Sequence, residues 1–168
     1  MRYHLIVPAA GSGRRFASTV PKQYAALAGS TVIEHALAPF AADADCVSIV
    51  VAVAADDAHW PAIASGLGSR ATTVAGGEQR AHSVLNALRS LASHVRSDDW
   101  VFVHDGARPC FADSDLGRLK QELADHAVGG LLAVPLADTL KRGDAAGFSL
   151  RSIDAGAGCG AGRESSAY

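Results

Sequence analysis

The sequence lacks the features that mark a membrane, secreted or nucleic-acid-binding protein. No apolar run is long enough to span a bilayer, and residues 1–4 do not lead into the apolar core of a signal peptide. The formal net charge is only −2, so it offers no electrostatic case for a nucleic-acid or anionic-membrane partner. We therefore expect a soluble, intracellular protein with neither kind of partner.

Cysteine is also scarce. Cys46, Cys110 and Cys159 are odd in number, widely spaced and form no Cys-x-x-Cys motif, which favours reduced thiols in a cytoplasmic protein. Charged residues make up only 19% of the chain and hydrophobic residues 49%, a balance that argues against disorder. A chain of 168 residues without visible repeats or linkers suits one domain with a substantial core.

Two common nucleotide-binding motifs are absent. No Gly-Lys-Ser/Thr follows residues 11–13, which excludes a Walker A loop, and Phe16 stands where the dinucleotide fingerprint needs its third glycine. The apolar run 5–7 instead leads into two glycines and three cations, Arg14, Arg15 and Lys22. Main-chain N–H groups of a glycine bend attract anions, and cations strengthen this, so we predict a phosphate-binding loop. The alternative is a glycine turn with a basic, solvated face.

Apolar runs alternate with helical patterns along the chain. The expected strands cover residues 3–7, 46–53, 71–75, 100–104 and 130–136. The expected helices begin at the capping spacing of residues 31–34, at 56–57 (to about 65), at 78 (to 91) and at 113. In the helix from residue 78, the apolar face would contain Val84, Leu85, Leu88 and Leu91. This alternation predicts an α/β fold whose largely parallel sheet carries helices on both faces.

Charged or glycine-rich segments follow four of these strands. They cover residues 11–22, 76–80, 105–109 and 138–142. Ligands of parallel sheets bind beyond the carboxyl ends of the strands, so we expect the four segments to form one site.

Asp105 directly follows an apolar strand, a suitable place for a magnesium ligand that shares the ion with substrate phosphates. The alternative is a turn-forming aspartate before Gly106.

His104 is expected to be a packed strand-end histidine rather than a base, and Ser83 a solvated or back-bonded helical hydroxyl. The spacing of the residues indicates no Ser/His/Asp or Cys/His arrangement for nucleophilic catalysis. Basic loops with one metal carboxylate favour phosphoryl or nucleotidyl transfer.

Five motifs carry a resemblance to a known family. They are residues 8–16, 21–24, 76–80 with Ser83, 104–109 and 138–141. In this order they resemble the motifs of the 2-C-methyl-D-erythritol 4-phosphate cytidylyltransferases of the bacterial non-mevalonate isoprenoid pathway, over roughly residues 3–154. The resemblance implies a Rossmann-like three-layer nucleotidyltransferase fold, mostly parallel and incomplete in its C-terminal part. It also implies a homodimer for full-length members of the family.

The implied enzyme is a nucleotidyltransferase that moves a cytidylyl group from CTP to 2-C-methyl-D-erythritol 4-phosphate, releasing pyrophosphate, with magnesium as cofactor. An acceptor phosphate oxygen would attack the α-phosphorus directly. The implied catalytic residues are Arg15 and Lys22, and Asp105 would bind the metal. The nucleotide would be held by Ala10, Gly11, Ser12, Gly13, Arg14, Gly77, Glu78, Arg80, Ser83, Gly106 and Arg108. Thr139 and Lys141 would approach the acceptor.

The chain departs from the family pattern after Asp154. Residues 155–168 are glycine-rich and replace the family's arginine, Gly-Leu-Trp segment and Thr-Pro-Gln motif. We therefore expect an incomplete catalytic domain over residues 1–154 and a disordered tail over 155–168. A reading-frame shift after Asp154 is one hypothesis, which resequencing the gene would decide. A genuinely shortened chain is the alternative.

Two other functions stay open at this point. One is a cytidylyltransferase acting on another polyol phosphate, such as ribitol 5-phosphate. The other is a non-catalytic nucleotide-binding or dimerising remnant. The sequences of residues 21–24 and 104–109 favour the methylerythritol phosphate enzyme over the one acting on another polyol phosphate.

Overall fold

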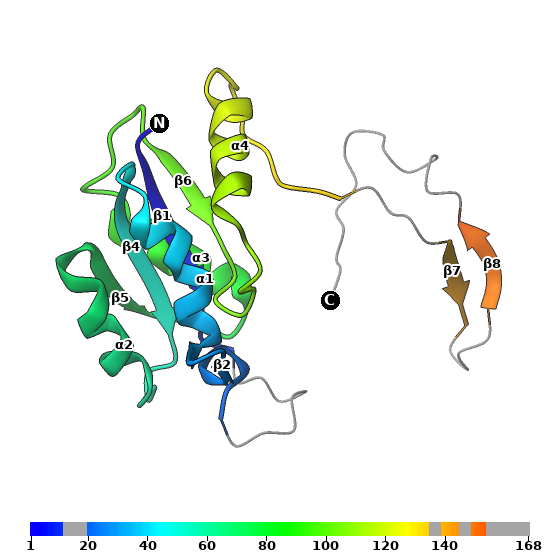
Figure 1. Ribbon diagram of the computed structural model, residues 1–168, viewed down its shortest axis with the longest axis horizontal. Coiled ribbons are helices and arrows are strands. Elements are labelled where there is room, and N and C mark those ends of the chain that lie inside the picture. The colour runs from blue at the N-terminus through cyan, green and yellow to red at the C-terminus, as the bar shows by residue number, and fades with distance from the viewer. Residues whose placement is uncertain (12–19, 135–138, 145–148, 154–168) are drawn as a thin grey trace. The chain divides into compact units, whose positions relative to one another are not determined.

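A computed structural model describes residues 1–11, 20–134, 139–144 and 149–153 (Figure 1). The chain divides into two compact units, Met1–Gly130 and Leu131–Tyr168. The first unit holds a four-stranded sheet and its helices. In the second, β7 (Leu140–Gly143) and β8 (Ser149–Ile153) pair as an antiparallel hairpin that the sequence did not predict. No helix among these described residues is long and apolar enough to cross a membrane.

The sheet of the first unit is entirely parallel, in the order β5-β4-β1-β6. Its strands are β1 (Tyr3–Pro8), β4 (Cys46–Val53), β5 (Ala71–Ala75) and β6 (Trp100–Val103). In chain order this is the third, second, first and fourth strand of the sheet, so the winding direction reverses between β1 and β6. In a doubly wound sheet the ligand crevice lies at such a reversal, beyond the carboxyl ends of the strands. The predicted α/β class and mostly parallel sheet are confirmed.

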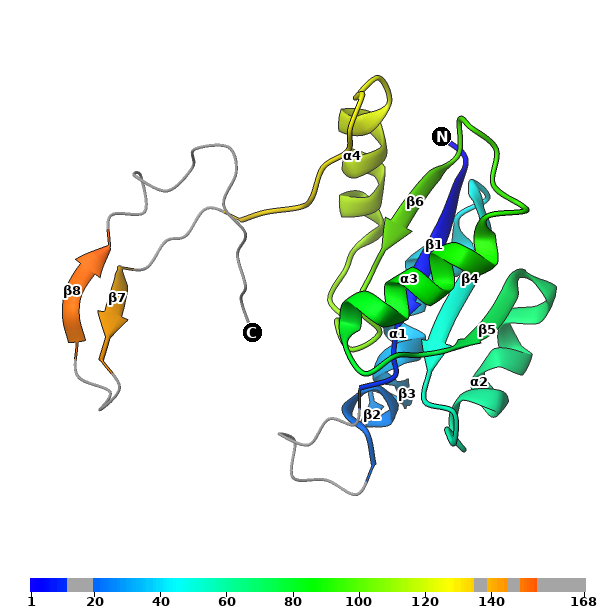
Figure 2. The same ribbon diagram turned by 180° about the vertical axis from the view of Figure 1, so that it is seen from behind.

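Helices cover both faces of this sheet, as Figures 1 and 2 show from opposite sides. Leu5 and Val7 of β1 face a core formed with α1 (Val32–Ala42), α2 (Trp60–Leu67) and α4 (Asp113–Leu123). Ile6 faces the opposite core, formed with α3 (Arg80–Leu91). This alternation follows from the two-residue period of a strand, and because both faces are covered the strand is apolar from Leu5 to Val7.

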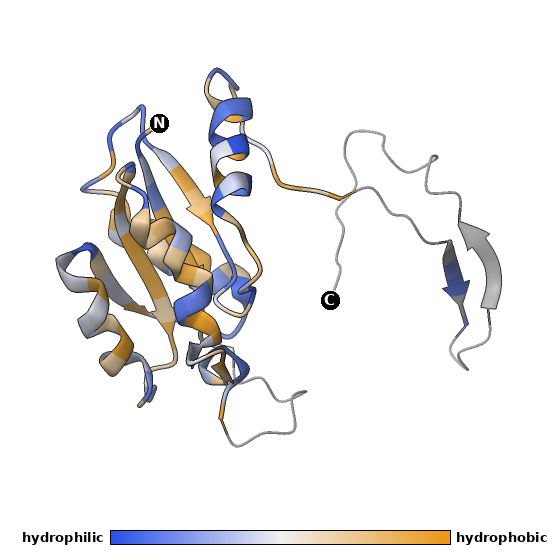
Figure 3. Cartoon of the chain, in the orientation of Figure 1, coloured by the Kyte–Doolittle hydropathy of each residue, from blue (hydrophilic) through white to orange (hydrophobic). Residues whose placement is uncertain are grey.

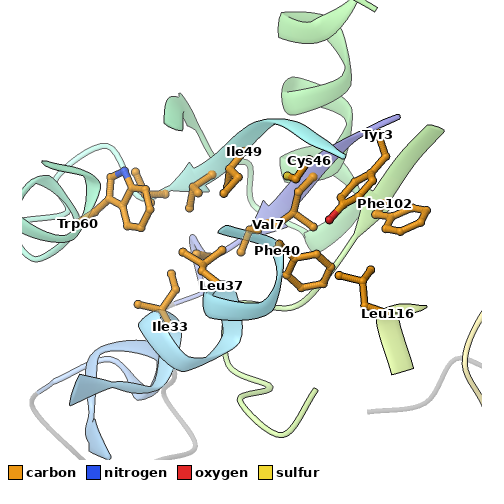
Figure 4. Packing of buried hydrophobic residues seen from close by; sticks show 14 of the residues in the cluster. Tyr3, Val7, Ile33, Leu37, Phe40, Cys46, Ile49, Trp60, Phe102 and Leu116 are labelled. Carbon is orange, nitrogen blue, oxygen red and sulfur yellow. The ribbon is translucent and has the colours of Figure 1, made fainter. Parts of the chain in front are cut away.

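Aromatic side chains pack together in the core between the sheet and helices α1, α2 and α4 (Figure 4). The Tyr3 ring stacks on Phe102 with centroids 4.4 Å apart and meets Phe40 edge-on at 6.5 Å. Colouring by hydropathy shows the hydrophobic residues concentrated along β4, while α4 is largely hydrophilic (Figure 3). Of the residues on α4, Leu116 and Leu123 are buried.

Two predicted helix starts differ from the structure. The helix expected from residue 56 begins at Trp60, because the Asp57 carboxylate accepts the N–H groups of His59 and Trp60 and holds a turn before it. The helix expected from residue 78 begins at Arg80, after an extended Gln79. The capping spacing at residues 31–34 is confirmed. Glu34 N–H donates to the Thr31 hydroxyl, and the Glu34 carboxylate accepts the Thr31 N–H at 2.8 Å.

Three predictions about burial or strand formation are wrong. On α3 the buried residues are Ser83, Ala87 and Leu91, whereas Leu85 and Leu88 are about two-fifths exposed at 42% and 41%. Residues 100–104 were expected to form a buried strand, but β6 lies at the edge of the sheet that the described residues form, and only its Phe102 is buried. Residues 130–134 form no strand and are mostly exposed, because apolar content without a neighbouring strand does not build a ladder. Residues 135–136 of that prediction lie outside the described ranges.

A charged cluster ties α4 to the start of β4. Lys120 Nζ donates to both carboxylate oxygens of Asp43, at 3.1 and 2.9 Å, and forms an ion pair with Asp45. The Tyr3 hydroxyl donates to Asp43 at 3.0 Å. Burial alone would raise the pKa of Asp43, but these hydrogen bonds lower it, and the hydrogen bond from Lys120 lowers the pKa of Asp45. Both carboxylates in turn raise the pKa of Lys120 against the effect of its burial.

Replacing Lys120 by methionine is expected to lower the free energy of unfolding by about 2 kcal/mol near neutral pH, the scale of a charged hydrogen bond. The lowered aspartate pKa values add stability that is present above the unfolded-state value and is lost as pH falls through the native value. The raised lysine pKa adds stability that is lost as pH rises through its native value. The difference between wild type and variant should therefore be largest from about pH 5 to pH 10. Urea unfolding across pH tests this, and a difference that stays constant down to pH 2 contradicts it.

Candidate functional site

The segment after β1 is held by main-chain and side-chain hydrogen bonds. Ala9 N–H donates to Ala52 O at 2.8 Å, which extends the β1–β4 ladder past Pro8. The Gln23 side chain is buried, and its Nε2 donates to Ala9 O at 2.8 Å and to Gly11 O at 3.2 Å. These residues line one side of a hollow of about 320 Å³ whose other side is residues 54–59. The start of the predicted phosphate-binding loop is thus fixed against the sheet.

Lys22 opens a short 3-10 helix, Lys22–Tyr24, and its side chain is exposed. The helix is anchored by Tyr24, which is buried, stacks on His59 at 5.0 Å and donates its hydroxyl to Asp57 at 2.6 Å. Burial, helped by the Asp57 carboxylate, raises the pKa of Tyr24 far above its ordinary value, so the phenol stays protonated. The main chain of Lys22 is therefore fixed while its ammonium group reaches solvent.

The segment after β5 packs against the segment after β1. Gly76 N–H donates to Val53 O at 2.8 Å, and a Cβ atom at Gly76 would overlap the Cβ of Ala10. Gly77 N–H donates to the Ser83 hydroxyl at 3.0 Å, and this hydroxyl donates to Gln79 O at 3.4 Å. Ser83 is only 3% exposed. The expectation of a solvated Ser83 is wrong, whereas that of a hydroxyl bonded back to the main chain is confirmed.

Asp105 lies just past β6 and pairs with two arginines. One carboxylate oxygen accepts a hydrogen bond from Arg80 Nε at 2.8 Å, and the other forms an ion pair with Arg108 Nε at 3.1 Å. Arg108 N–H also donates to Asp105 O at 3.1 Å, so the expected turn is present as well. Gly106 is buried, and a Cβ there would lie 3.2 Å from Val7 and Ile33 side-chain atoms. The pairing joins Arg80 of α3 and Arg108 to the turn that follows β6.

His104 is a packed residue, as the sequence predicted. Its ring lies 5.2 Å from those of Phe40 and Phe111, and its Nε2 lies 3.0 Å from the Arg108 carbonyl oxygen, to which it donates. Burial lowers its pKa, which favours the neutral ring. Its main-chain N–H donates to Ile6 O at 3.0 Å and continues the β1–β6 pairing.

The structure brings together most of the predicted nucleotide residues that it describes. Ala10 contacts the Gly76–Ser83 segment, and Asp105, Arg80 and Arg108 form one ion-pair cluster. Glu78 is exposed on the same loop as Gly77. Thr139 and Lys141 are exposed residues of the second unit and are described within it only. The predicted residues Ser12, Gly13, Arg14 and Arg15 lie outside the described ranges, as does the tail over residues 154–168.

Sequence reasoning gave no role to Gln23, Tyr24 or Asp57, which hold the main chain around Lys22. The available signal was a polar side chain directly beside a predicted catalytic lysine. Among the residues that the structure describes, no cluster of three or more His, Cys, Asp or Glu side chains could hold a metal by itself. Asp105 is a single carboxylate, which suits a magnesium ion whose remaining ligands are phosphate oxygens and water.

Residues 3–156 match the family model described as 2-C-methyl-D-erythritol 4-phosphate cytidylyltransferase, IspD. The chain belongs to this family. Over 150 residues it is 50% identical to the protein of that name from Pseudomonas putida strain GB-1, with 89% of this chain and 64% of the relative covered. The relative from Pseudomonas fluorescens strain Pf-5 is 49% identical with the same coverage. The chain thus spans slightly less than two thirds of the length of these IspD proteins.

Solved structures of IspD proteins show the same fold. A 4-diphosphocytidyl-2C-methyl-D-erythritol synthase superimposes with a TM-score of 0.79 at 30% identity, covering 94% of this chain and 70% of that one. The Francisella tularensis IspD superimposes with a TM-score of 0.73 at 29% identity, covering 92% and 66%. These findings confirm the resemblance read from the five sequence motifs and the Rossmann-like nucleotidyltransferase fold.

Proposed function

We propose that this chain carries the cytidylyl transfer for which its relatives are named, from CTP to 2-C-methyl-D-erythritol 4-phosphate. The observation that carries the proposal is the meeting of three segments at the carboxyl edge of the sheet. Ala10 and Gly11, then Gly76 to Ser83, then Asp105 to Arg108 are joined there by packing and ion pairs. A nucleotide spanning this crevice would meet main-chain N–H groups, a buried hydroxyl and cations together.

Different residues are assigned to the base, the ribose and the triphosphate of the nucleotide. Gly77, Glu78 and Ser83 would lie at the cytosine, where the hydrogen bond from Gly77 N–H to the Ser83 hydroxyl holds the main chain in place. Gly106 and Arg108 would lie at the ribose, and the glycine loop with Lys22 at the triphosphate. Lys22 would stabilise the charge that grows on the α-phosphate as the acceptor oxygen attacks and pyrophosphate leaves. Arg15 has the same proposed role.

Magnesium is the proposed cofactor, with Asp105 as its protein ligand. The ion would neutralise charge on the triphosphate. Arg80 and Arg108 now occupy both oxygens of the Asp105 carboxylate, and both guanidinium groups are mostly exposed. They are therefore available to turn toward phosphate oxygens when CTP and its metal engage Asp105.

Thr139 and Lys141 are proposed to contact the methylerythritol phosphate. A homodimer, as the family resemblance implies, is the proposed assembly of the full-length enzyme. We further propose a cytoplasmic enzyme without a nucleic-acid or membrane partner. The wording of residues 21–24 and 104–109 favours this acceptor over ribitol 5-phosphate.

Pyrophosphate release with CTP, magnesium and each acceptor in turn tests the proposal. Turnover is expected with 2-C-methyl-D-erythritol 4-phosphate, and its loss on chelation by EDTA should be reversed by added magnesium. Turnover with ribitol 5-phosphate alone would select the second acceptor. CTP binding without turnover on either acceptor would indicate a nucleotide-binding remnant. Failure of the chain to bind CTP would overturn the proposal altogether.

A further inference from the structure

Gln23 is a buried polar side chain with a specific set of partners. It is 4% exposed, and its one amide nitrogen donates to two main-chain oxygens, Ala9 O at 2.8 Å and Gly11 O at 3.2 Å. Both hydrogen bonds cross from the 3-10 helix that bears Lys22 to the loop after β1. Gln23 therefore connects two segments to which the proposed function assigns the triphosphate.

The geometry of a trans peptide gives these bonds a further consequence. The C=O and the following N–H of one peptide unit point in opposite directions. Because Ala9 O points at Gln23, Ala10 N–H points away from it, and it donates to no other residue that the structure describes. Ala10 itself packs against Gly76, which leaves that peptide little freedom to rotate.

We propose that Gln23 is the positioning residue of the triphosphate site, and this inference rests on the proposed function. By binding Ala9 O and Gly11 O, it turns the intervening main chain so that Ala10 N–H faces the nucleotide. Since Gln23 directly follows Lys22, the same side chain also fixes the main chain of Lys22 relative to Ala9 and Gly11. In this role Gln23 does not contact the substrate itself. It acts only through the main chain to which it is hydrogen-bonded.

Loss of the amide leaves two partly or fully buried carbonyl oxygens without their donor, and the loop is then free to rotate them toward water. Misplacing substrate-binding groups by about 1 Å costs on the order of a hundredfold in rate. We therefore expect Gln23→Met, which keeps the length and shape of the side chain, to lower kcat/KM by roughly tenfold to a hundredfold. Gln121→Met on α4 is the matched control, because Gln121 is exposed.

The test combines kcat/KM and CTP affinity with hydrogen–deuterium exchange, all measured well below the melting temperature. The expected result for Gln23→Met is faster exchange confined to the loop after β1 together with weaker CTP binding, while β4 and α3 exchange as in wild type. Gln23→Asn keeps the donor but is one methylene too short to reach both oxygens, so it should show the same pattern and replaces the first variant if that one does not fold.

Two outcomes would overturn the inference. One is CTP affinity within about threefold of wild type in a folded variant, a change too small for loss of a positioning contact. The other is exchange that rises evenly across the sheet, which indicates a purely structural role. Failure of the proposed function is recognised separately, because wild-type protein would then show no cytidylyl transfer, whereas the exchange measurement still reports whether Gln23 holds the loop.

Discussion

Replacing Lys22 by alanine is expected to lower turnover about a thousandfold, the effect of deleting one preorganised charge at a transition state. Lys22 is the exposed first residue of the 3-10 helix, and its main chain is held by Tyr24 and Gln23 rather than by its own side chain. The free energy of unfolding should therefore change by less than about 0.5 kcal/mol, as for other surface substitutions. Steady-state kinetics and thermal unfolding of the same preparation test both parts.

Two controls sharpen this experiment. Lys22→Arg keeps the charge at a different reach and should recover part of the lost rate. Arg89→Ala removes an exposed cation from α3 and should leave turnover unchanged. Near-normal turnover of the alanine variant would exclude a catalytic role for Lys22, and a large drop in stability would mean that its side chain supports the fold.

Replacing Gly76 by alanine is expected to destabilise the protein by about 2 kcal/mol and to weaken CTP binding strongly, because overpacking shifts the surrounding main chain. The new Cβ would overlap Ala10 and would lie 3.2 Å from both Val53 O and the Ser83 hydroxyl. The main chain at Gly76 and that at Ala10 cannot both keep their positions. Urea unfolding and CTP titration measure the two effects.

Gly117→Ala is the matched control for this substitution. Gly117 lies within α4, and a Cβ there meets no atom within 4 Å, so the variant should gain about 0.5–1 kcal/mol from helix propensity. Combining Gly76→Ala with Ala10→Gly removes the most severe overlap and should recover part of the stability. Strictly additive effects in this double-mutant cycle would show that the two positions are not in contact.

The strands of the sheet were predictable because their signal is local. β4 follows from a run rich in β-branched residues, and the start of α1 from a capping pattern four residues long. The face of α3 was not predictable in the same way. Ser83 and Ala87 are buried there because α3 packs closely on Ile6 and Val50, a closeness that small side chains permit and that hydropathy alone does not reveal.

In the candidate site, too, some features were predictable from local sequence and others were not. The order of motifs placed four segments at the carboxyl ends of strands, and the structure brings together the described parts of three of them. The pairing of Asp105 with Arg80 joins residues 25 positions apart and depends on how α3 lies across the sheet. The hydrogen bonds from Gln23 likewise require the 3-10 helix to lie against the main chain of Ala9 and Gly11. Such contacts arise from tertiary packing, which no short window of sequence contains.

The central place of β1 has a consequence for how the chain folds. Leu5 pairs with Ile49 on one side and with Phe102 on the other, so the earliest strand finds its neighbours 44 and 97 positions later. Parallel pairing over such separations is slow, because a long loop must close before the contact stabilises it. During synthesis this apolar strand would therefore gain its first neighbour only after residue 53 has left the ribosome. One of its edges would stay unpaired and prone to aggregation until residue 103 follows.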